Sequence, residues 1–253
     1  LCKNQTAFIR ALQQKKGRDE YRCFVAEGLK MVNDILRSGI RVKAIYSSSN
    51  FQHSLFSHNV EVFRITDREM SRISSLNSPS EVLVVCEIPD HPLEMTALKG
   101  KLSLVLDDIR DPGNLGTIVR IADWFGISDV ICSMESVDLY NPKAIQATMG
   151  SVARVKLHYR NLADFFREVP RELDVFGAFL EGENIYKASL PKDGILVIGN
   201  EGKGISEGAG THITRRLAIP SFAHVRNDQS EAESLNAAMA CGILCSEFRR
   251  RIL

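Results

Sequence analysis

The sequence has no apolar run long enough to cross a membrane and no cysteine spacing typical of disulfide frameworks or zinc sites. A membrane-spanning helix needs roughly 20 consecutive apolar residues, and no apolar run in these 253 residues approaches that length. The six cysteines include no CxxC pair, which predicts free thiols, a reducing compartment and no bound metal. The first four residues show no signal-peptide pattern. We therefore expect a cytoplasmic protein that makes no membrane contact.

The chain also lacks a strong charge of either sign. Its 32 Lys and Arg residues face 31 Asp and Glu residues, so the formal net charge is +1. A strongly basic domain would be an electrostatic indication of nucleic-acid binding, and the composition supplies none. Two local basic clusters, at 10–22 and at 249–251, are each typical of a solvated helix face. Hydrophobic residues make up 44% of the chain, as in an ordinary globular protein with a full core.

Alternating strand and helix patterns divide the chain into two α/β parts. The first part has predicted strands at 22–26, 42–46, 60–64 and 82–86, with helices at 7–12 and 28–37 and a capping box that opens a helix at Thr66. Pro89 and Pro92 then interrupt regular structure, and we expect domains at 1–98 and 99–253. The second part has predicted strands at 102–106, 130–132, 175–179, 195–198 and 217–219, and helices at 114–125, from Asn141, at 162–166 and at 234–249. Such alternation predicts a parallel sheet covered by helices.

Three segments in the second part follow predicted strands and carry glycines or polar side chains, at 107–120, 199–204 and 219–236. In open parallel sheets, ligands bind at the carboxyl ends of the strands. The glycines of the middle segment follow GxxGxG spacing, which is neither the Rossmann nor the Walker pattern. The sequence thus predicts a polar site at this edge, without the usual signatures of a dinucleotide or nucleoside triphosphate.

Each candidate residue also has a purely structural interpretation. The glycines at 199, 202 and 204 suit a tight turn as well as a ligand cradle. Asn114 suits a helix cap, and Arg120 suits a surface ion pair with Asp123 or Glu201. Cys241 and Cys245, one helical turn apart, suit a buried helix face better than a metal pair.

Taken together, the three segments resemble the motifs of the SpoU/TrmH family of RNA methyltransferases, in the SPOUT superfamily. The first motif, an Asn followed by a helical Arg, matches Asn114 and Arg120. The second, a strand that runs into Gly-x-Glu-x-x-Gly, matches 198–204, and the third, Ile-Pro followed by Ser-Leu-Asn, matches 219–220 and 234–236. The resemblance covers 101–253. Residues 221–233 separate the two halves of the third motif more widely than is usual, which indicates an inserted surface loop.

The resemblance implies a trefoil-knotted parallel sheet, the α/β knot, at 99–253. General rules of chain topology would have excluded a knot. A shorter match at 24–28 implies that the smaller N-terminal domain, 1–98, is an L30e-like α/β domain that binds the RNA substrate. The implied activity is transfer of a methyl group from S-adenosyl-L-methionine to a ribose 2′-hydroxyl of rRNA or tRNA. A homodimer that builds each site from two chains is implied as well.

The resemblance also implies a role for each site residue. Arg120 would hold a phosphate and stabilise the developing alkoxide, because a guanidinium is a poor proton acceptor. Asn114 and Glu201 would position Arg120 and the ribose, and Ser234 and Asn236 would position substrate and cofactor by hydrogen bonds. The implied cofactor-binding residues are Leu180, Glu181, Gly199, Asn200, Gly202, Ile219, Pro220 and Leu235.

Two other classes of function remain open from the sequence. One is a non-catalytic RNA-binding α/β protein, which failure to bind S-adenosylmethionine would favour. The other is a nucleotide-dependent α/β enzyme such as a dehydrogenase, whose glycine fingerprint is missing. A cofactor-binding screen discriminates between these classes.

Overall fold

The computed structural model describes residues 1–48, 60–222 and 234–250 and divides into two compact units. Unit 1 consists of 1–90 together with 138–154, and unit 2 consists of 91–137 together with 155–253. The first division of the chain thus falls between Asp90 and His91, and the return of 138–154 to unit 1 has no counterpart in the boundary expected at 98/99. No helix among the described residues is long and apolar enough to span a membrane.

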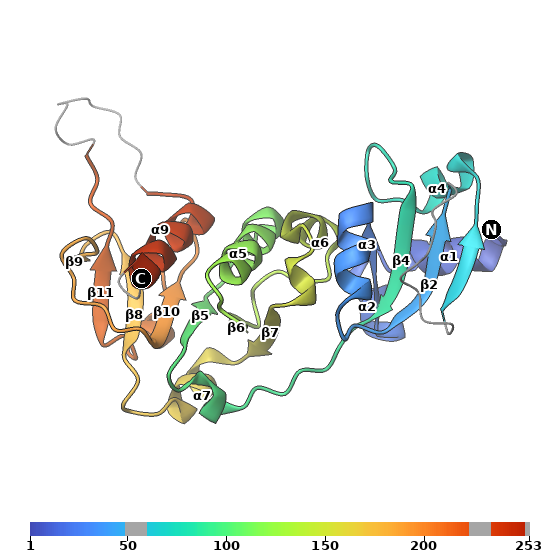
Figure 1. The fold of residues 1–253 in the computed structure, drawn as a ribbon. Helices are drawn as coiled ribbons and strands as arrows, with labels where there is room; N and C mark the ends of the chain where they lie inside the picture. The colour runs from blue at the N-terminus through green and yellow to red at the C-terminus, as the bar shows by residue number, and fades with distance from the viewer. Residues whose placement is uncertain (49–59, 223–233, 251–253) are drawn as a thin grey trace. The chain divides into compact units, whose positions relative to one another are not determined.

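Unit 1 is built on a four-stranded mixed sheet with the order β1-β4-β2-β3 (Figure 1). Strand β4 runs antiparallel to β1 and β2, and β3 runs parallel to β2. The elements are α1 (Lys3–Ala11), α2 (Lys15–Tyr21), β1 (Cys23–Glu27), α3 (Leu29–Leu36), β2 (Val42–Ser47), β3 (Glu61–Arg64), α4 (Asp67–Ile73) and β4 (Val82–Glu87). The predicted capping box is confirmed, since Thr66 and Glu69 exchange side chain to backbone hydrogen bonds at the start of α4.

Segment 138–154, which carries α6 (Pro142–Thr148) and the 3-10 helix η2 (Ser151–Ala153), packs into unit 1. Asp138 accepts a 2.8 Å hydrogen bond from the Arg18 Nε and forms an ion pair with the Arg18 Nη2 at 2.8 Å, and the Arg18 side chain is only 3% exposed. The Tyr140 ring packs on Phe24 at 4.7 Å between centroids. Arg18, from the basic cluster expected to be a solvated helix face, is therefore a core residue that holds this segment in place.

Unit 2 is built on a seven-stranded sheet with the order β7-β6-β5-β10-β8-β11-β9 (Figure 1). Every strand pair in it is parallel, which confirms the predicted parallel sheet. The strands are β5 (Leu102–Leu106), β6 (Asp129–Ser133), β7 (Lys156–Arg160), β8 (Val175–Phe179), β9 (Glu183–Asn184), β10 (Gly194–Ile198) and β11 (Arg215–Ala218). The helices are α5 (Pro112–Trp124), α7 (Leu162–Glu168), α8 (Glu207–Gly210) and α9 (Ala237–Arg250), with the 3-10 helix η1 (Met95–Leu98).

Helices cover both faces of this sheet. On one face, Phe165 and Phe166 of α7 pack with Val105, Ile131 and Val197 of the central strands. On the other face, α5 and α9 lie against each other, and Phe248 of α9 meets Phe176 of β8 edge-on. Because all strands are parallel, the loops that follow β5, β8, β10 and β11 emerge at one edge of the sheet. This edge holds the segments singled out in the sequence.

The structure adds elements that the sequence patterns missed and shifts some predicted ends. Strand β7 alternates polar and apolar residues at the edge of the sheet, so it lacks the apolar run of a buried parallel strand. Helix α2 has no apolar stripe and relies on the buried Arg18. The predicted helix 234–249 begins at Ala237 instead, because Asn236 accepts hydrogen bonds from the N–H groups of Ala238 and Met239 and so caps it.

Candidate active site

Three polar side chains from distant parts of the chain form a hydrogen-bonded row at the carboxyl edge of the unit 2 sheet. The Asn114 amide of α5 donates to the Glu201 carboxylate in a short hydrogen bond. The Asn236 amide donates to the Asn114 side-chain oxygen at 2.8 Å. Asn236 holds the start of α9 with its own oxygen, so the row joins the three sequence segments into one structure.

Asn114 is available for this row because it does not cap its helix. The structure places the start of α5 at Pro112, with Asp111 as the capping residue. The Asp111 carboxylate accepts the N–H of Asn114 at 2.8 Å. The alternative interpretation of Asn114 as a cap is therefore wrong, and its side chain lies within the first helical turn, where both its donor and its acceptor are used.

The loop after β10 is a tight turn closed by glycine. Asn200 and Gly204 exchange backbone hydrogen bonds of 3.0 and 2.8 Å, and the Asn200 oxygen accepts the N–H groups of Gly202 and Lys203. A Cβ on Gly199 would overlap the backbone of Gly204. This loop is consequently held in one shape by its own bonds, with Glu201 at its tip.

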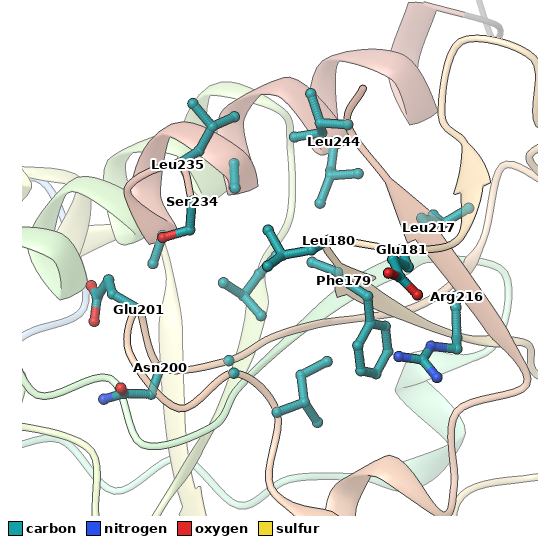
Figure 2. Close-up of a pocket in the computed structure, with 18 of the residues that line it drawn as sticks. Phe179, Leu180, Glu181, Asn200, Glu201, Arg216, Leu217, Ser234, Leu235 and Leu244 are labelled. Carbon is teal, nitrogen blue, oxygen red and sulfur yellow. The ribbon is translucent and has the colours of Figure 1, made fainter. Parts of the chain in front are cut away.

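A pocket of about 740 Å³ lies beside this loop, within the size range of small-molecule sites. Figure 2 shows its walls: Leu180 and Glu181 from the chain after β8, Asn200 and Glu201 from the loop after β10, and Ser234 and Leu235 before α9. Ile219 and Pro220, which follow β11, complete the lining. Leucine and isoleucine side chains supply much of the apolar surface, while Glu181, Glu201, Lys203, Arg216 and the loop backbone supply polar groups. This combination suits a ligand with a flat apolar part and charged groups of both signs.

The structure brings most, but not all, of the predicted site residues to this pocket. All eight predicted cofactor-binding residues line it, as do Glu201 and Ser234; they are Leu180, Glu181, Gly199, Asn200, Gly202, Ile219, Pro220 and Leu235. Asn114 and Asn236 reach it through the hydrogen bond to Glu201. Arg120 stands apart from both the pocket lining and the row.

Arg120 lies on the exposed side of α5, about 120° around the helix axis from Asn114. Within the described ranges it forms no hydrogen bond and no ion pair. The alternative of an ion pair with Asp123 or Glu201 is therefore absent from the structure. Trp124, one turn further along the same side of α5, is 85% exposed. Arg120 is thus a free cation on a surface that also carries a large apolar side chain.

Sequence reasoning missed several residues of this edge. Arg216 stacks on the Phe179 ring at 3.9 Å, and both line the pocket together with Leu244. Asp108 has a left-handed backbone with φ of 57° directly after β5. The Asp-Asp pair that ends the β5 segment was the available signal, since Asp tolerates that conformation. No three His, Cys, Asp or Glu side chains group as a metal site would require in the part of the chain that the structure describes.

Two family models match the chain over these units. The model of the SpoU rRNA Methylase family matches residues 101–246. The model of the MRM3-like substrate binding domain matches residues 3–84. The first match covers more than half of the chain and includes all three segments of the candidate site.

Individual relatives extend over the whole chain. The 23S rRNA (guanosine(2553)-2′-O)-methyltransferase RlmP of Bacillus subtilis is 28% identical over 241 residues, which span 94% of this chain and 93% of the relative. A solved TrmH-family putative RNA methyltransferase of Porphyromonas gingivalis is 38% identical, with a TM-score of 0.87 over 99% of both chains. The AdoMet-bound rRNA methyltransferase of Sinorhizobium meliloti is 31% identical, with a TM-score of 0.85 over 99% of this chain and 96% of that one. With the family model matched across all three segments of the candidate site and relatives of the same kind that span nearly the whole chain, the chain belongs to the SpoU rRNA methylase family.

Proposed function

We infer that the chain is an enzyme that transfers a methyl group from S-adenosyl-L-methionine to a ribose 2′-hydroxyl of RNA. The observation that carries this conclusion is the pocket at the carboxyl edge of a parallel sheet, which the second and third family segments line and to whose rim Asn114 of the first segment is hydrogen-bonded through Glu201. The relative from Bacillus subtilis acts on 23S rRNA, so we propose rRNA as the substrate, with tRNA as the alternative. The reducing state expected for the six cysteines favours the cytoplasm.

The pocket fits S-adenosylmethionine on its own chemistry. Leu180, Ile219 and Leu235 offer apolar surface for an adenine ring, and the closed loop 199–204 offers backbone groups that can read its edge. Glu181 and Glu201 place two carboxylates in the lining, where they complement the positive charge of a sulfonium and an amino group. The bound cofactor supplies an activated methyl group on a positively charged sulfur.

The chain's own residues would orient the attacking ribose and stabilise its oxygen. The fixed row Glu201–Asn114–Asn236 presents amide and carboxylate groups at the pocket edge, and we assign it the positioning of the ribose. Ser234 lines the pocket on the same side and would hold substrate and cofactor by hydrogen bonds. The 2′-hydroxyl proton passes to a phosphate oxygen or to water, because Arg120 remains protonated.

We propose that Arg120 acts on the pocket of a second copy of the chain. Its exposed position on α5, outside the pocket lining and the hydrogen-bonded row of its own chain, supports this. The paired helices α5 and α9 expose Trp124 and Met239, which are 85% and 65% accessible, and large apolar side chains of this kind favour a partner surface. In the homodimer, Arg120 would hold the RNA phosphate and the developing alkoxide of the partner's substrate.

The homodimer has a direct test, because Trp124 is the sole tryptophan of the chain. We expect light scattering to give a dimer at micromolar concentration, with Trp124 fluorescence that shifts to longer wavelength upon dilution to the monomer. Trp124→Glu should produce monomers that bind S-adenosylmethionine but methylate RNA slowly. A fully active monomer would contradict the two-chain site.

We propose that unit 1 selects the RNA and does no chemistry, and that the unit 2 sheet is knotted. The match of the substrate-binding model to 3–84 supports the first proposal. The strand order supports the second, since β10 is inserted between β5 and β8, although β8 and β9 precede it in the chain. Both proposals also rest on the family to which the chain belongs.

The test of the proposed function combines binding with product mapping. Calorimetry should show binding of S-adenosylmethionine, and NAD should not bind. Cells that lack the protein should lose one 2′-O-methylated nucleotide of rRNA or tRNA, and the purified protein should restore it. RNA binding without cofactor binding or product would instead indicate a non-catalytic RNA-binding protein.

A further inference from the structure

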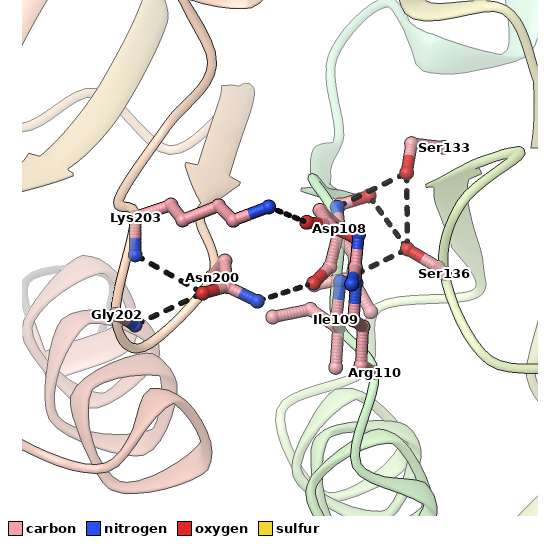
Figure 3. A network of polar contacts seen from close by, with 9 residues as sticks. Asp108, Ile109, Arg110, Ser133, Ser136, Asn200, Gly202 and Lys203 are labelled. Atoms are coloured by element: carbon pink, nitrogen blue, oxygen red, sulfur yellow. Dashed lines mark hydrogen bonds and ion pairs between the residues drawn. The ribbon is translucent and has the colours of Figure 1, made fainter.

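The chain makes an unusual turn between β5 and α5, next to the closed loop 199–204. Asp108 adopts φ of 57°, a left-handed conformation that residues other than glycine, asparagine and aspartate rarely adopt. Two hydrogen bonds hold it there, one from its N–H to the Ser133 hydroxyl at 3.0 Å and one from the Asn200 amide to its carbonyl at 2.9 Å (Figure 3). A strained residue fixed in this way indicates that its side chain has a task.

The Asp108 carboxylate holds two cations that come from different loops. Its Oδ1 accepts a 2.6 Å hydrogen bond from the Arg110 Nε, and its Oδ2 lies 3.8 Å from the Lys203 Nζ (Figure 3). The carboxylate is 17% exposed, whereas the two cationic side chains are 62% and 70% exposed. Ion pairs this exposed contribute little to stability. Stability therefore does not account for a strained turn that gathers these two cations.

Most of the donors in this cluster are unused. The Arg110 Nη atoms and the Lys203 ammonium make no other hydrogen bond within the described ranges. Glu135 is the second carboxylate near Arg110; after Asp108, its charge adds to the rise in the Arg110 pKa, but it forms no ion pair with Arg110. The Arg110–Lys203 pair thus presents cationic donors to solvent on a fixed spacing.

The pair also stands where a strand of RNA would pass. Lys203 lines the pocket and lies two residues after Glu201 in the same closed turn. Arg110 precedes the first turn of α5, which carries Asn114. Both cations therefore flank the row that we assign to the reacting ribose, on two loops that Asn200 ties together.

We propose that Arg110 and Lys203 bind a backbone phosphate of the RNA strand beside the target ribose, with Asp108 as the positioning residue for both. This deepens the proposed function and rests on it. Phosphate contacts fix the register of a protein on a nucleic acid without reading sequence. Arginine and lysine bonded to phosphate make the strong, charge-assisted hydrogen bonds that such anchoring needs.

The test compares two double variants that remove the same charge from opposite edges of the sheet. Arg110→Gln with Lys203→Gln removes the proposed phosphate site. Arg171→Gln with Lys192→Gln is the matched control, because these exposed residues precede β8 and β10 at the amino edge. RNA affinity is measured by fluorescence anisotropy between about 50 and 200 mM KCl, a range over which phosphate contacts weaken strongly, alongside steady-state methylation and cofactor calorimetry.

We expect the site variant to raise the KM for RNA about tenfold or more, since each lost charged hydrogen bond reaches that size. The salt slope of binding should fall by about 1 to 2, one per phosphate contact, with S-adenosylmethionine affinity and melting temperature unchanged. The control should match the wild type. A site variant that also matches the wild type, or one that loses cofactor affinity, overturns the proposal, while a wild type without cofactor binding or methylation overturns the proposed function itself.

The substitution Asp108→Asn tests whether Asp108 positions Arg110 and Lys203, because it leaves the charges of these two cations in place. The amide keeps the left-handed turn but frees both cations, so RNA affinity should stay equal or increase while kcat falls. If RNA affinity falls in parallel with the melting temperature, Asp108 serves the fold alone and the positioning role is wrong. Arg110→Lys with Lys203→Arg keeps both charges and should retain the salt slope of the wild type.

Discussion

The two edges of the seven-stranded sheet carry similar polar side chains, but these side chains have different roles. At the carboxyl edge, Asn114, Glu201 and Asn236 bond to one another at the rim of a pocket. At the start of β6, Asp129 accepts a 3.1 Å hydrogen bond from His158, whose side chain is only 3% exposed, and His158 also contacts the His91 carbonyl at 3.1 Å. The first group has room for a ligand beside it, while the second is enclosed by protein. The exposure of the polar side chains, more than their residue type, therefore distinguishes a candidate ligand site from a hydrogen bond that only stabilises the fold.

The largest expected effect tests the carboxyl edge. Arg120→Ala should lower kcat by about 10²–10³, the usual cost of removing one preorganised donor to a developing oxyanion. S-adenosylmethionine affinity should change little, because Arg120 lies outside the pocket lining. Arg120→Lys should recover only a small part, since a point charge cannot bridge phosphate and ribose as the planar fork does.

Single-turnover rates beside melting temperatures check this prediction. A structural role would lower the melting temperature of both variants and leave the turnover of the folded fraction intact. Mixing Arg120→Ala chains with Glu201→Ala chains, which keep their own Arg120 but lack the carboxylate of the hydrogen-bonded row, offers a further check. Mixed dimers should regain one working site in the proposed two-chain arrangement, and no recovery would contradict it.

The second effect tests the amino edge. The hydrogen bond from His158 holds the pKa of Asp129 at about 2, below its usual value near 4. A depressed carboxyl pKa stabilises the fold above the unfolded pKa, and this contribution of about 2 kcal/mol is lost as pH falls from about 4 toward 2. Asp129→Asn should lower the unfolding free energy at pH 7 by about this amount and flatten its acid dependence. Denaturant titrations at several pH values measure both.

Turnover of the folded Asp129→Asn protein should equal that of the wild type, in contrast to Arg120→Ala. A drop in kcat without loss of stability would contradict the purely structural role that we assign to the bond between Asp129 and His158. Lys156→Gln, an exposed substitution at the start of β7 next to Asp129 in the strand register, is the control for charge alone and should change neither quantity by more than a few tenths of a kcal/mol.

The smallest expected effect concerns the glycine loop 199–204 in the pocket wall. Gly199→Ala places a Cβ on the backbone of Gly204, so the turn must open, and we expect S-adenosylmethionine affinity to fall about tenfold, which corresponds to about 1.4 kcal/mol. Gly202→Ala is the matched control, because its Cβ meets only the Asn200 oxygen at 3.7 Å. Calorimetry on both variants decides whether the loop shape or merely its glycine content matters.

The sequence predicted the parallel sheet well because its buried strands are almost entirely apolar, as in β5, where Ser103 is the one polar residue, and in β10. It predicted the pocket residues through motif resemblance, since composition gave only a polar edge. It could not predict that Asp111, and not Asn114, caps α5, because both residues suit that place and only the tertiary bonds of Asn114 decide. Nor could it predict Arg18 in a core, since its partner Asp138 is 120 positions away.

The return of 138–154 to unit 1 limits how the protein can be divided. The chain passes between the units at 90/91, 137/138 and 154/155, so no single cut releases an intact unit. Removal of 1–98 would strip buried Leu139, Ile145 and Val152 of their packing partners, and such a fragment would aggregate before it could report on RNA selection. A chimera that exchanges the RNA-binding specificity of two family members must transplant 1–90 and 138–154 together, as one discontinuous module.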